Sequence, residues 1–390
     1  MGGIARRATK ITEARGRGTP TIVVDAGGSA PLYDQQGEIK FEMLLESFRQ
    51  MKYDAISIGT REMLMQRDTY NAWEKLKASR IPLATLNITF KGKRLRRKPL
   101  IIRRGGVRVG VVSFFVGGHI PKSAKKYWTV GDPEKIADAQ LAYARKKADL
   151  VIAMLHGNMS QVSAFTKKHK GIDIAILSHC LEQLQTPVDV NGSLLLCAGS
   201  QGQYLGRVDA SLSGGTWRFD SQLIALDRTV PGDPLLIETY ARYLERVAQL
   251  SEELTKKHEE ERADKFPPVL RAQDCQRCHI AIYNRWAKTP HAHAIDSLME
   301  KNEHQNPECI VCHVTSYHTG GFISWEKTPE YAGVQCVQCH GRMDGHIEFH
   351  SGTSQKGDAP PQVQQTTCLQ CHTPDQDDDF DFERDEKLIH

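Results

Sequence analysis

Between residues 20 and 228, short apolar runs alternate with segments whose apolar positions recur every three or four residues. The first pattern is typical of buried strands and the second of helices that cover them. The apolar runs predict strands at 21–25, 55–58, 83–88, 107–115, 150–155, 172–177, 194–198, 205–212 and 217–226. The helical spacing predicts helices at 39–52, 65–77 and 137–147. Strands that alternate with helices favour a layered α/β domain, which we assign to residues 1–230.

The pattern changes after that domain. Residues 234–264 form one long polar segment with an apolar stripe, and we assign residues 231–266 to a linker helix. The prolines at 267 and 268 end this helix, because proline cannot continue the hydrogen-bond ladder. Residues 267–390 are rich in His, Gln, Asp and Gly and have little apolar periodicity. We expect a mostly α-helical or irregular domain there.

The pattern C-x-x-C-H occurs four times in this last domain. Its cysteines are Cys275, Cys278, Cys309, Cys312, Cys336, Cys339, Cys368 and Cys371. The histidines that follow them are His279, His313, His340 and His372. Two cysteines at this spacing can each form a thioether to one vinyl group of a haem, and the histidine then lies under the iron. The motifs therefore predict four covalently bound c-type haems, with these histidines as proximal ligands. The alternative is two zinc sites built from C-x-x-C pairs, but zinc does not require a histidine directly after each pair.

The haems would also complete the core of this domain. A segment of this length with so few aliphatic residues is unlikely to form an ordinary hydrophobic core, so we expect the domain to be disordered without haem.

Seven further histidines of this domain could bind the second face of the irons: His291, His293, His304, His318, His346, His350 and His390. A second histidine makes a low-spin iron suited to electron transfer, whereas an open position would admit a small molecule. Seven candidates for four irons favour mostly bis-histidine ligation.

Composition narrows the class of protein. With 40% hydrophobic residues, 25% charged residues and a net charge of +4, the chain has the balance of a soluble globular protein and not of a nucleic-acid binder. It contains no apolar run long enough for a transmembrane helix.

Two segments have an unusual local charge. Residues 91–104 carry eight basic residues. They indicate either a docking surface for an acidic partner or, as we favour, a solvated turn and edge strand. The acidic tail, residues 375–390, has interleaved apolar residues and is expected to pack back onto the domain.

Two features concern the compartment. Because c-type haem is normally attached outside the cytoplasm, we expect an extracytoplasmic protein, periplasmic or extracellular. Met1–Pro20 has the basic residues of a signal peptide but no apolar segment after them, so either the signal peptide has been removed or the true start lies upstream of Met1. The two remaining cysteines, Cys180 and Cys197, form either a disulfide or two buried thiols.

The C-terminal domain resembles the tetrahaem cytochrome c-554 family over about residues 269–390. The resemblance is carried by residues 286–294, by residues 336–341 with His346, and by residues 380–382 with His390. It implies that His291, His346 and His390 are distal ligands, with His293 as a rival to His291 and His318 as the fourth candidate. It also implies that one iron can lack a distal ligand.

The N-terminal domain is similar to the metallophosphatase domain of secreted 5′-nucleotidases over about residues 2–228. The segments that carry the similarity are residues 2–7, 24–27, 59–62, 155–156, 177–179 and 198–206. The family clamps two metal ions that activate water against a phosphate ester. This resemblance implies a layered fold with the family's metal site.

Departures from that family remove most of its metal ligands. Gly28 stands where the bridging aspartate is expected, Thr60 and Arg61 where an asparagine and a histidine are expected, and Leu181 in place of a second histidine. The strand that carries the family's first aspartate and histidine is absent before Met1, which leaves only His156 and His179. Arg61 would also bring a positive charge to a cation position. We expect a degenerate metal site.

The prediction is an extracytoplasmic tetrahaem c-type cytochrome that carries electrons between redox partner proteins. It is an electron-transfer protein more than a hydrolase, and self-association into haem-lined assemblies is a further possibility. One alternative is a haem oxidoreductase that acts on a small nitrogen compound at one open iron. Another is a metal-dependent 5′-nucleotidase with an appended cytochrome.

Overall fold

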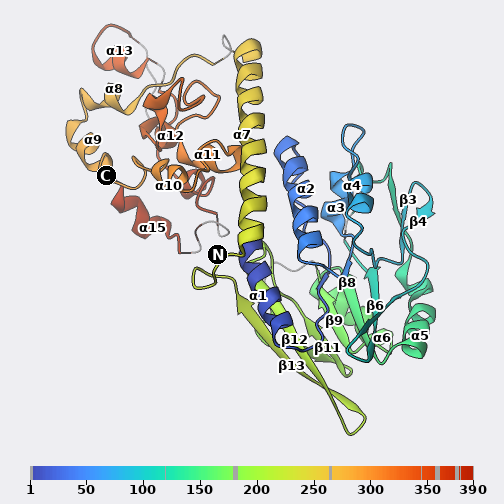
Figure 1. The fold of residues 1–390 in the computed structure, drawn as a ribbon. Coiled ribbons are helices and arrows are strands. Elements are labelled where there is room, and N and C mark those ends of the chain that lie inside the picture. The colour runs from blue at the N-terminus through green and yellow to red at the C-terminus, as the bar shows by residue number, and fades with distance from the viewer. Residues whose placement is uncertain are drawn as a thin grey trace. The chain divides into compact units, whose positions relative to one another are not determined.

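The computed structural model describes residues 3–118, 120–178, 183–262, 266–343, 345–355, 361–373, 377 and 379–389. The chain divides into two compact units, Met1–Tyr243 (unit 1) and Leu244–His390 (unit 2). The division falls within helix α7, Pro234–Arg262, in the segment that the sequence analysis assigns to a linker helix (Figure 1). Among the described residues, no helix combines the length and apolarity that a membrane span requires.

Unit 1 is built around a six-stranded sheet with the strand order β10-β11-β9-β8-β6-β5. Its strands are β5 (Leu100–Arg104), β6 (Val107–Phe115), β8 (Leu150–His156), β9 (Ile174–Leu177), β10 (Val188–Val190) and β11 (Ser193–Leu196). The four middle strands run parallel, and antiparallel β5 and β10 form the edges. Parallel strands are buried on both faces, which is why the sequence shows them as continuous apolar runs.

Three smaller sheets complete unit 1. Strands β1 (Val24–Asp25) and β2 (Ala55–Ile56) pair in parallel. Strands β4 (Lys93–Arg94), β3 (Ile88–Phe90) and β7 (Trp128–Val130) form a three-stranded antiparallel sheet. Strands β12 (Tyr204–Ser213) and β13 (Thr216–Ala225) form a long hairpin whose turn residues, Gly214 and Gly215, both have positive φ. Two such glycines suit the right-handed twist of a tight hairpin.

The helices of unit 1 agree only in part with the sequence prediction. They are α1 (Ile4–Gly16), α2 (Gln35–Gln50), α3 (Thr60–Met65), α4 (Ala72–Ala78), α5 (Ala137–Lys147) and α6 (Met159–Lys168), with a 3₁₀ turn at Pro133–Lys135. The prediction of one helix over residues 65–77 is wrong. Gln66 is extended and ends α3, and the Asn71 side chain caps the start of α4. Helices α1 and α6 were not predicted.

The central sheet packs on both faces, as a layered α/β unit requires. On β6, Val112 and Phe114 face a core that includes Leu141 of α5 and Phe165 of α6. Val111, on the alternate face of the same strand, belongs to a second core cluster. Residues of β1, β12 and β13 pack against that second cluster. The predicted α/β layered architecture is confirmed.

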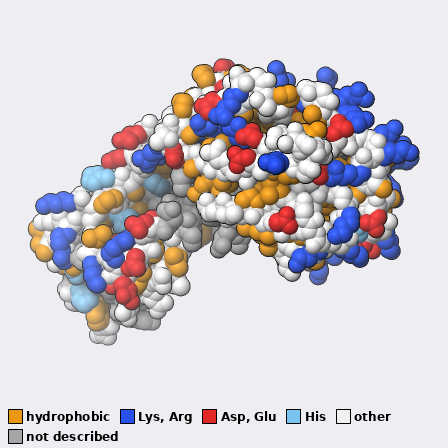
Figure 2. Space-filling view, turned by 90° about the horizontal axis from the view of Figure 1, so that it is seen from below, with side chains coloured by type: hydrophobic (Ala, Val, Ile, Leu, Met, Phe, Trp, Pro, Cys, Tyr) orange, Lys and Arg blue, Asp and Glu red, His pale blue; other side chains and the backbone are white. Residues whose placement is uncertain are grey.

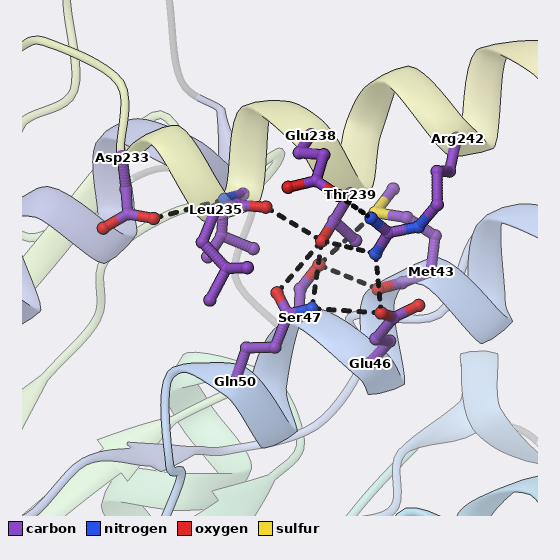
Figure 3. A network of polar contacts seen from close by, with 10 residues as sticks. Met43, Glu46, Ser47, Gln50, Asp233, Leu235, Glu238, Thr239 and Arg242 are labelled. Atoms are coloured by element: carbon purple, nitrogen blue, oxygen red, sulfur yellow. Dashed lines mark hydrogen bonds and ion pairs between the residues drawn. The ribbon is translucent and has the colours of Figure 1, made fainter.

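The first turns of α7 are attached to α2 by polar contacts (Figure 3). Gln50 Nε2 donates to Thr239 Oγ1 at 3.0 Å, and Arg242 forms an ion pair of 2.8 Å with Glu46. Tyr243, the last residue of unit 1, accepts a hydrogen bond from the buried Gln36 side chain. The beginning of the long helix is therefore part of the fold of unit 1.

Unit 2 consists of short helices joined by irregular segments. They are α8 (Ala272–Gln276), α9 (Ile280–Trp286), α10 (Asp296–Met299), α11 (Pro307–His313), α12 (Cys336–His340), α13 (His346–His350), α14 (Gln365–Cys368) and α15 (Phe382–Asp385), with 3₁₀ turns at Pro329–Tyr331 and Glu386–Leu388. Its core cluster has seven buried residues: Val269, Ile295, Ile310, Val314, Phe322, Tyr331 and Val337. This small core and the irregular chain agree with the predicted class of the domain.

Cys197 is buried and disulfide-bonded, which favours the disulfide over two free thiols. Cys180 lies outside the described residues.

Candidate functional site

Each C-x-x-C-H motif lies at a short helical turn. In the first motif the His279 N–H donates to the Cys275 carbonyl at 3.0 Å, and in the fourth the His372 N–H donates to the Cys368 carbonyl at 2.9 Å. Residues three apart in such a turn lie on the same side of it. The two cysteines of a motif can therefore reach one flat group together, with the histidine one position further along.

The four motifs lie close together, but not in sequence order. The thiols of Cys275 and Cys336 lie close enough to shift each other's pKa, upward for Cys275 and downward for Cys336, which makes the first and third motifs neighbours. Burial and the neighbouring Cys312 thiol together raise the pKa of Cys371, so the second and fourth motifs are also neighbours. The third and fourth motifs share a cavity of about 300 Å³ that Cys339 and Cys368 both line. The motifs are thus neighbours in the order first, third, fourth, second.

That cavity is mostly apolar and is closed by the C-terminal tail. Its lining includes His291, His340 and Val363, together with Phe382 and Ile389 from the tail. Burial raises the pKa of the Cys339 thiol to about 11. A cavity lined by both cysteines and the histidine of the third motif, with apolar walls, has the donor set and surroundings that a covalently attached haem needs. The predicted packing of the tail onto the domain is confirmed for these residues.

Two proximal histidines are oriented by hydrogen bonds to the chain. His313 Nδ1 lies 2.6 Å from the Ala294 carbonyl oxygen, and His372 Nδ1 lies 2.7 Å from Asp377 Oδ2. Because the carbonyl and carboxylate oxygens can only accept a hydrogen bond, each histidine must carry its proton on Nδ1. The Nε2 atom is then unprotonated and can bind iron. Phe380 also stacks on the His372 ring at 4.7 Å. The sequence analysis missed Asp377 and Phe380 as partners of His372; the aromatic residues interleaved in the acidic tail were the only signal for them.

Among the predicted distal ligands, His291 is well placed. Its ring centre lies 5.8 Å from that of His372, and it lines the cavity that holds the third motif. Burial, assisted by the neighbouring His372, lowers the pKa of His291 and so favours the neutral imidazole that metals bind. The rival His293 is exposed, with Nε2 3.1 Å from the Ala287 carbonyl oxygen and Nδ1 3.4 Å from Asp296. The geometry favours His291 over His293.

The other distal candidates occupy different places in unit 2. His346 begins α13, and its ring centre lies 4.5 Å from that of His350. His318 has a positive φ of 54° and stacks on Tyr317. His390 lies outside the described residues. In the described part of the chain, Nδ1 of His304 is buried without a hydrogen-bond partner, as expected for a side chain whose partner is a cofactor.

The zinc alternative does not fit this arrangement. No group of three or more His, Cys, Asp or Glu side chains among the described residues could hold a metal ion. All eight motif cysteines belong to the described residues, and none of them is in a disulfide. Structural zinc needs four convergent ligands, whereas a c-type haem needs only two cysteines and one histidine on its own face.

The position of the metallophosphatase-like site in unit 1 is filled by protein hydrogen bonds. His156 is buried, with Nε2 3.1 Å from Thr60 Oγ1 and Nδ1 2.8 Å from Ser178 Oγ. Both ring nitrogens are therefore engaged by hydroxyl groups. Arg61 is exposed, and His179 lies outside the described residues.

Glu62 closes the same region from the other side. Its buried carboxylate accepts hydrogen bonds from the backbone N–H groups of Gly28, Ala30 and Gly59 at 2.8–3.0 Å. Burial raises the pKa of Glu62, and these three backbone bonds oppose that shift. A Cβ on Gly59 would lie 2.7 Å from the His156 ring, so only glycine allows this close packing. Among the described residues, the region is a packed loop in which the Glu62 carboxylate is engaged by backbone N–H groups.

Fold and site together define a protein with a metallophosphatase-like α/β unit and a unit of the c-type cytochrome kind. The family described as "Cytochrome c554 and c-prime" matches residues 274–341, which contain the first three C-x-x-C-H motifs. Cytochrome c-554 of Nitrosomonas europaea is 30% identical over 90 residues, which cover 19% of this chain and 38% of that protein. The predicted resemblance of the C-terminal region is confirmed.

The relatives of the N-terminal region belong to the nucleotidase fold. Snake venom 5′-nucleotidase of Crotalus adamanteus is 26% identical over 204 residues, or 46% of this chain and 32% of that protein. The sulfate thiohydrolase SoxB of Thermus thermophilus has a TM-score of 0.57 at 19% identity, with 63% of this chain and 47% of that chain covered. This likeness confirms the fold of unit 1. The chain spans only about a third of the length of the curated relatives it matches.

Proposed function

We propose that this chain is a multihaem c-type cytochrome that carries electrons between redox partner proteins outside the cytoplasm. Each of the four C-x-x-C-H motifs would hold one haem, and the haem would supply the redox chemistry. The observation that carries the proposal is the contact between motifs: Cys275 with Cys336, and Cys312 with Cys371. Attachment sites in contact keep redox groups close, and electron tunnelling weakens steeply as their separation grows.

The test is haem content and iron spin state in the purified protein. We expect four covalently attached haems per chain, measured by mass and by the haem absorbance of the denatured protein. We also expect a mainly low-spin spectrum, because histidines are available for the second face of the irons. Fewer than four haems would contradict the proposal. A high-spin fraction that shifts on addition of nitrite or nitric oxide would instead favour the oxidoreductase with one open iron.

The contact between His372 and Asp377 leads to a separate prediction. A carboxylate that accepts the Nδ1 proton makes the histidine a stronger electron donor, which stabilises oxidised iron. We expect Asp377→Asn to raise the reduction potential of one haem, on the order of tens of millivolts, in a spectroelectrochemical titration. Asp379→Asn is the control, because the Asp379 side chain is 89% exposed and pairs with Arg384. Equal shifts in the two variants would contradict a specific role for Asp377.

A further inference from the structure

One surface of unit 1 has an unusually uniform charge. Residues 75–131 contain 15 Lys and Arg residues and no Asp or Glu. This stretch includes the end of α4 and the strands β3 to β7. Figure 2, seen from below, shows Lys and Arg side chains toward the end of unit 1 where Figure 1 places β3, β4 and α5. We call the exposed residues Lys91, Lys93, Arg94, Arg97 and Lys98 of this stretch the basic face.

Three of the five residues of the basic face are not neutralised by an ion pair within the described part of the chain. Several other basic residues of the stretch pair with acids from elsewhere, such as Lys126 with Asp68 and Arg108 with Asp149. Lys93, Arg94 and Arg97 have no ion pair with any described residue. A solvated surface normally mixes both signs of charge, because like charges held close together repel. The absence of acids from the stretch therefore favours the docking surface over the solvated edge that the sequence analysis preferred.

The complementary charge is present in the same protein. Residues 1–243 contain 36 Lys and Arg against 22 Asp and Glu, a net charge of +14. Residues 244–390 contain 15 Lys and Arg against 25 Asp and Glu, a net charge of −10. The net charge of +4 for the whole chain is therefore the sum of two units with large and opposite net charges.

We infer that the basic face docks against the acidic unit 2 of a second copy of this chain. The contact joins two different surfaces, so it is head-to-tail, and repeated contacts of this kind build a ring or an open chain of molecules. Opposite charges on the two surfaces steer the encounter and set its orientation. The negative charge of unit 2 comes from its side chains, so the inference does not depend on the electron-transfer proposal.

The experiment is sedimentation velocity of the full-length protein with its haems attached, at low and high salt. We expect association at low salt that weakens as salt is added, because the Debye length falls from about 30 Å at 0.01 M to about 3 Å at 1 M. The variant Lys93→Glu/Arg94→Glu/Arg97→Glu should raise the dissociation constant at least about tenfold. The control Lys170→Glu/Arg218→Glu/Arg228→Glu makes the same change of net charge at exposed residues outside the stretch, and it should associate much more nearly like the unmodified protein.

A charge exchange separates docking between copies from any contact within one chain. A second variant of the same protein, Asp379→Lys/Glu383→Lys, replaces two exposed acids of unit 2. This variant should also associate weakly with itself. Mixing this variant with the basic-face variant should restore association, because each then offers the surface that the other needs. A protein that stays monomeric at low salt, an equal effect of the control variant, or a mixture that remains dissociated would each overturn the inference.

Discussion

Replacing Glu62 with alanine should destabilise unit 1 by roughly 3–6 kcal/mol, since a buried donor that loses its acceptor costs about 1–3 kcal/mol. The Glu62 carboxylate satisfies three such donors, the backbone N–H groups of Gly28, Ala30 and Gly59. No water reaches these groups easily, because Glu62 has an exposed fraction of only 4%. The loss should appear as an early unfolding transition in urea, followed by far-ultraviolet circular dichroism of the full-length protein.

Two variants make this result specific. In Glu62→Gln one oxygen can still accept from Gly28 and Gly59, while the amide NH₂ group faces the Ala30 N–H, so we expect an intermediate loss. Glu74→Ala removes a carboxylate whose side chain is 57% exposed and should change stability by no more than about 0.5 kcal/mol. A Glu62→Ala protein that unfolds at the same urea concentration as the unmodified protein would rule out this role for the carboxylate.

The second large effect is expected at the third C-x-x-C-H motif. Cys336→Ser/Cys339→Ser should remove one attachment site and separate the first motif from the fourth and second, because the third motif lies between them. Electron exchange between the haem of the first motif and the haems of the fourth and second motifs should then slow on the order of a hundredfold or more. The reason is that the haem of the third motif, which lies between them, is lost, and electron tunnelling weakens steeply with distance. Stopped-flow reduction, followed at the haem absorption bands, should change from one phase to two.

The matched control is Cys275→Ser/Cys278→Ser, which removes the first attachment site, at the end of the order. The three remaining motifs stay adjacent, so reduction should keep a single phase with about a quarter less amplitude. Haem content and protease resistance of both variants should be measured first, to establish that unit 2 is folded. Two equally fast variants would mean that the contacts between cysteines do not define the order of exchange.

The sequence predicted best what depends on residues that are close together along the chain. The strands β6, β8 and β9 were evident because burial on both faces leaves continuous apolar runs. The break at residues 66–71 was missed because apolar spacing continues across it, whereas the hydrogen bond from the Trp73 N–H to the Gln66 side chain stabilises a turn instead. Helix α1 was missed because its basic residues suggested a signal peptide, although Ala8 and Ile11 are buried.

The same distinction applies to the site. The haem motifs are local patterns with a chemical reason for each position, so they could be read from the sequence. The order first, third, fourth, second depends on contacts between segments up to about sixty residues apart, such as Cys275 with Cys336, which no local pattern contains. The partner of His372 lies only five residues away, but Asp377 is one acid among several in the tail, and only the fold selects it.

The hydrogen bonds that fill the phosphatase-like site have a consequence for how the protein is made. Because Thr60 and Ser178 engage both ring nitrogens of His156, we expect unit 1 to fold without a metal. Domains generally fold as units, so unit 1 can reach its native state before haem is attached to unit 2. We therefore expect a chain whose haem attachment is blocked to keep a protease-resistant unit 1, while the segment that carries the C-x-x-C-H motifs is digested.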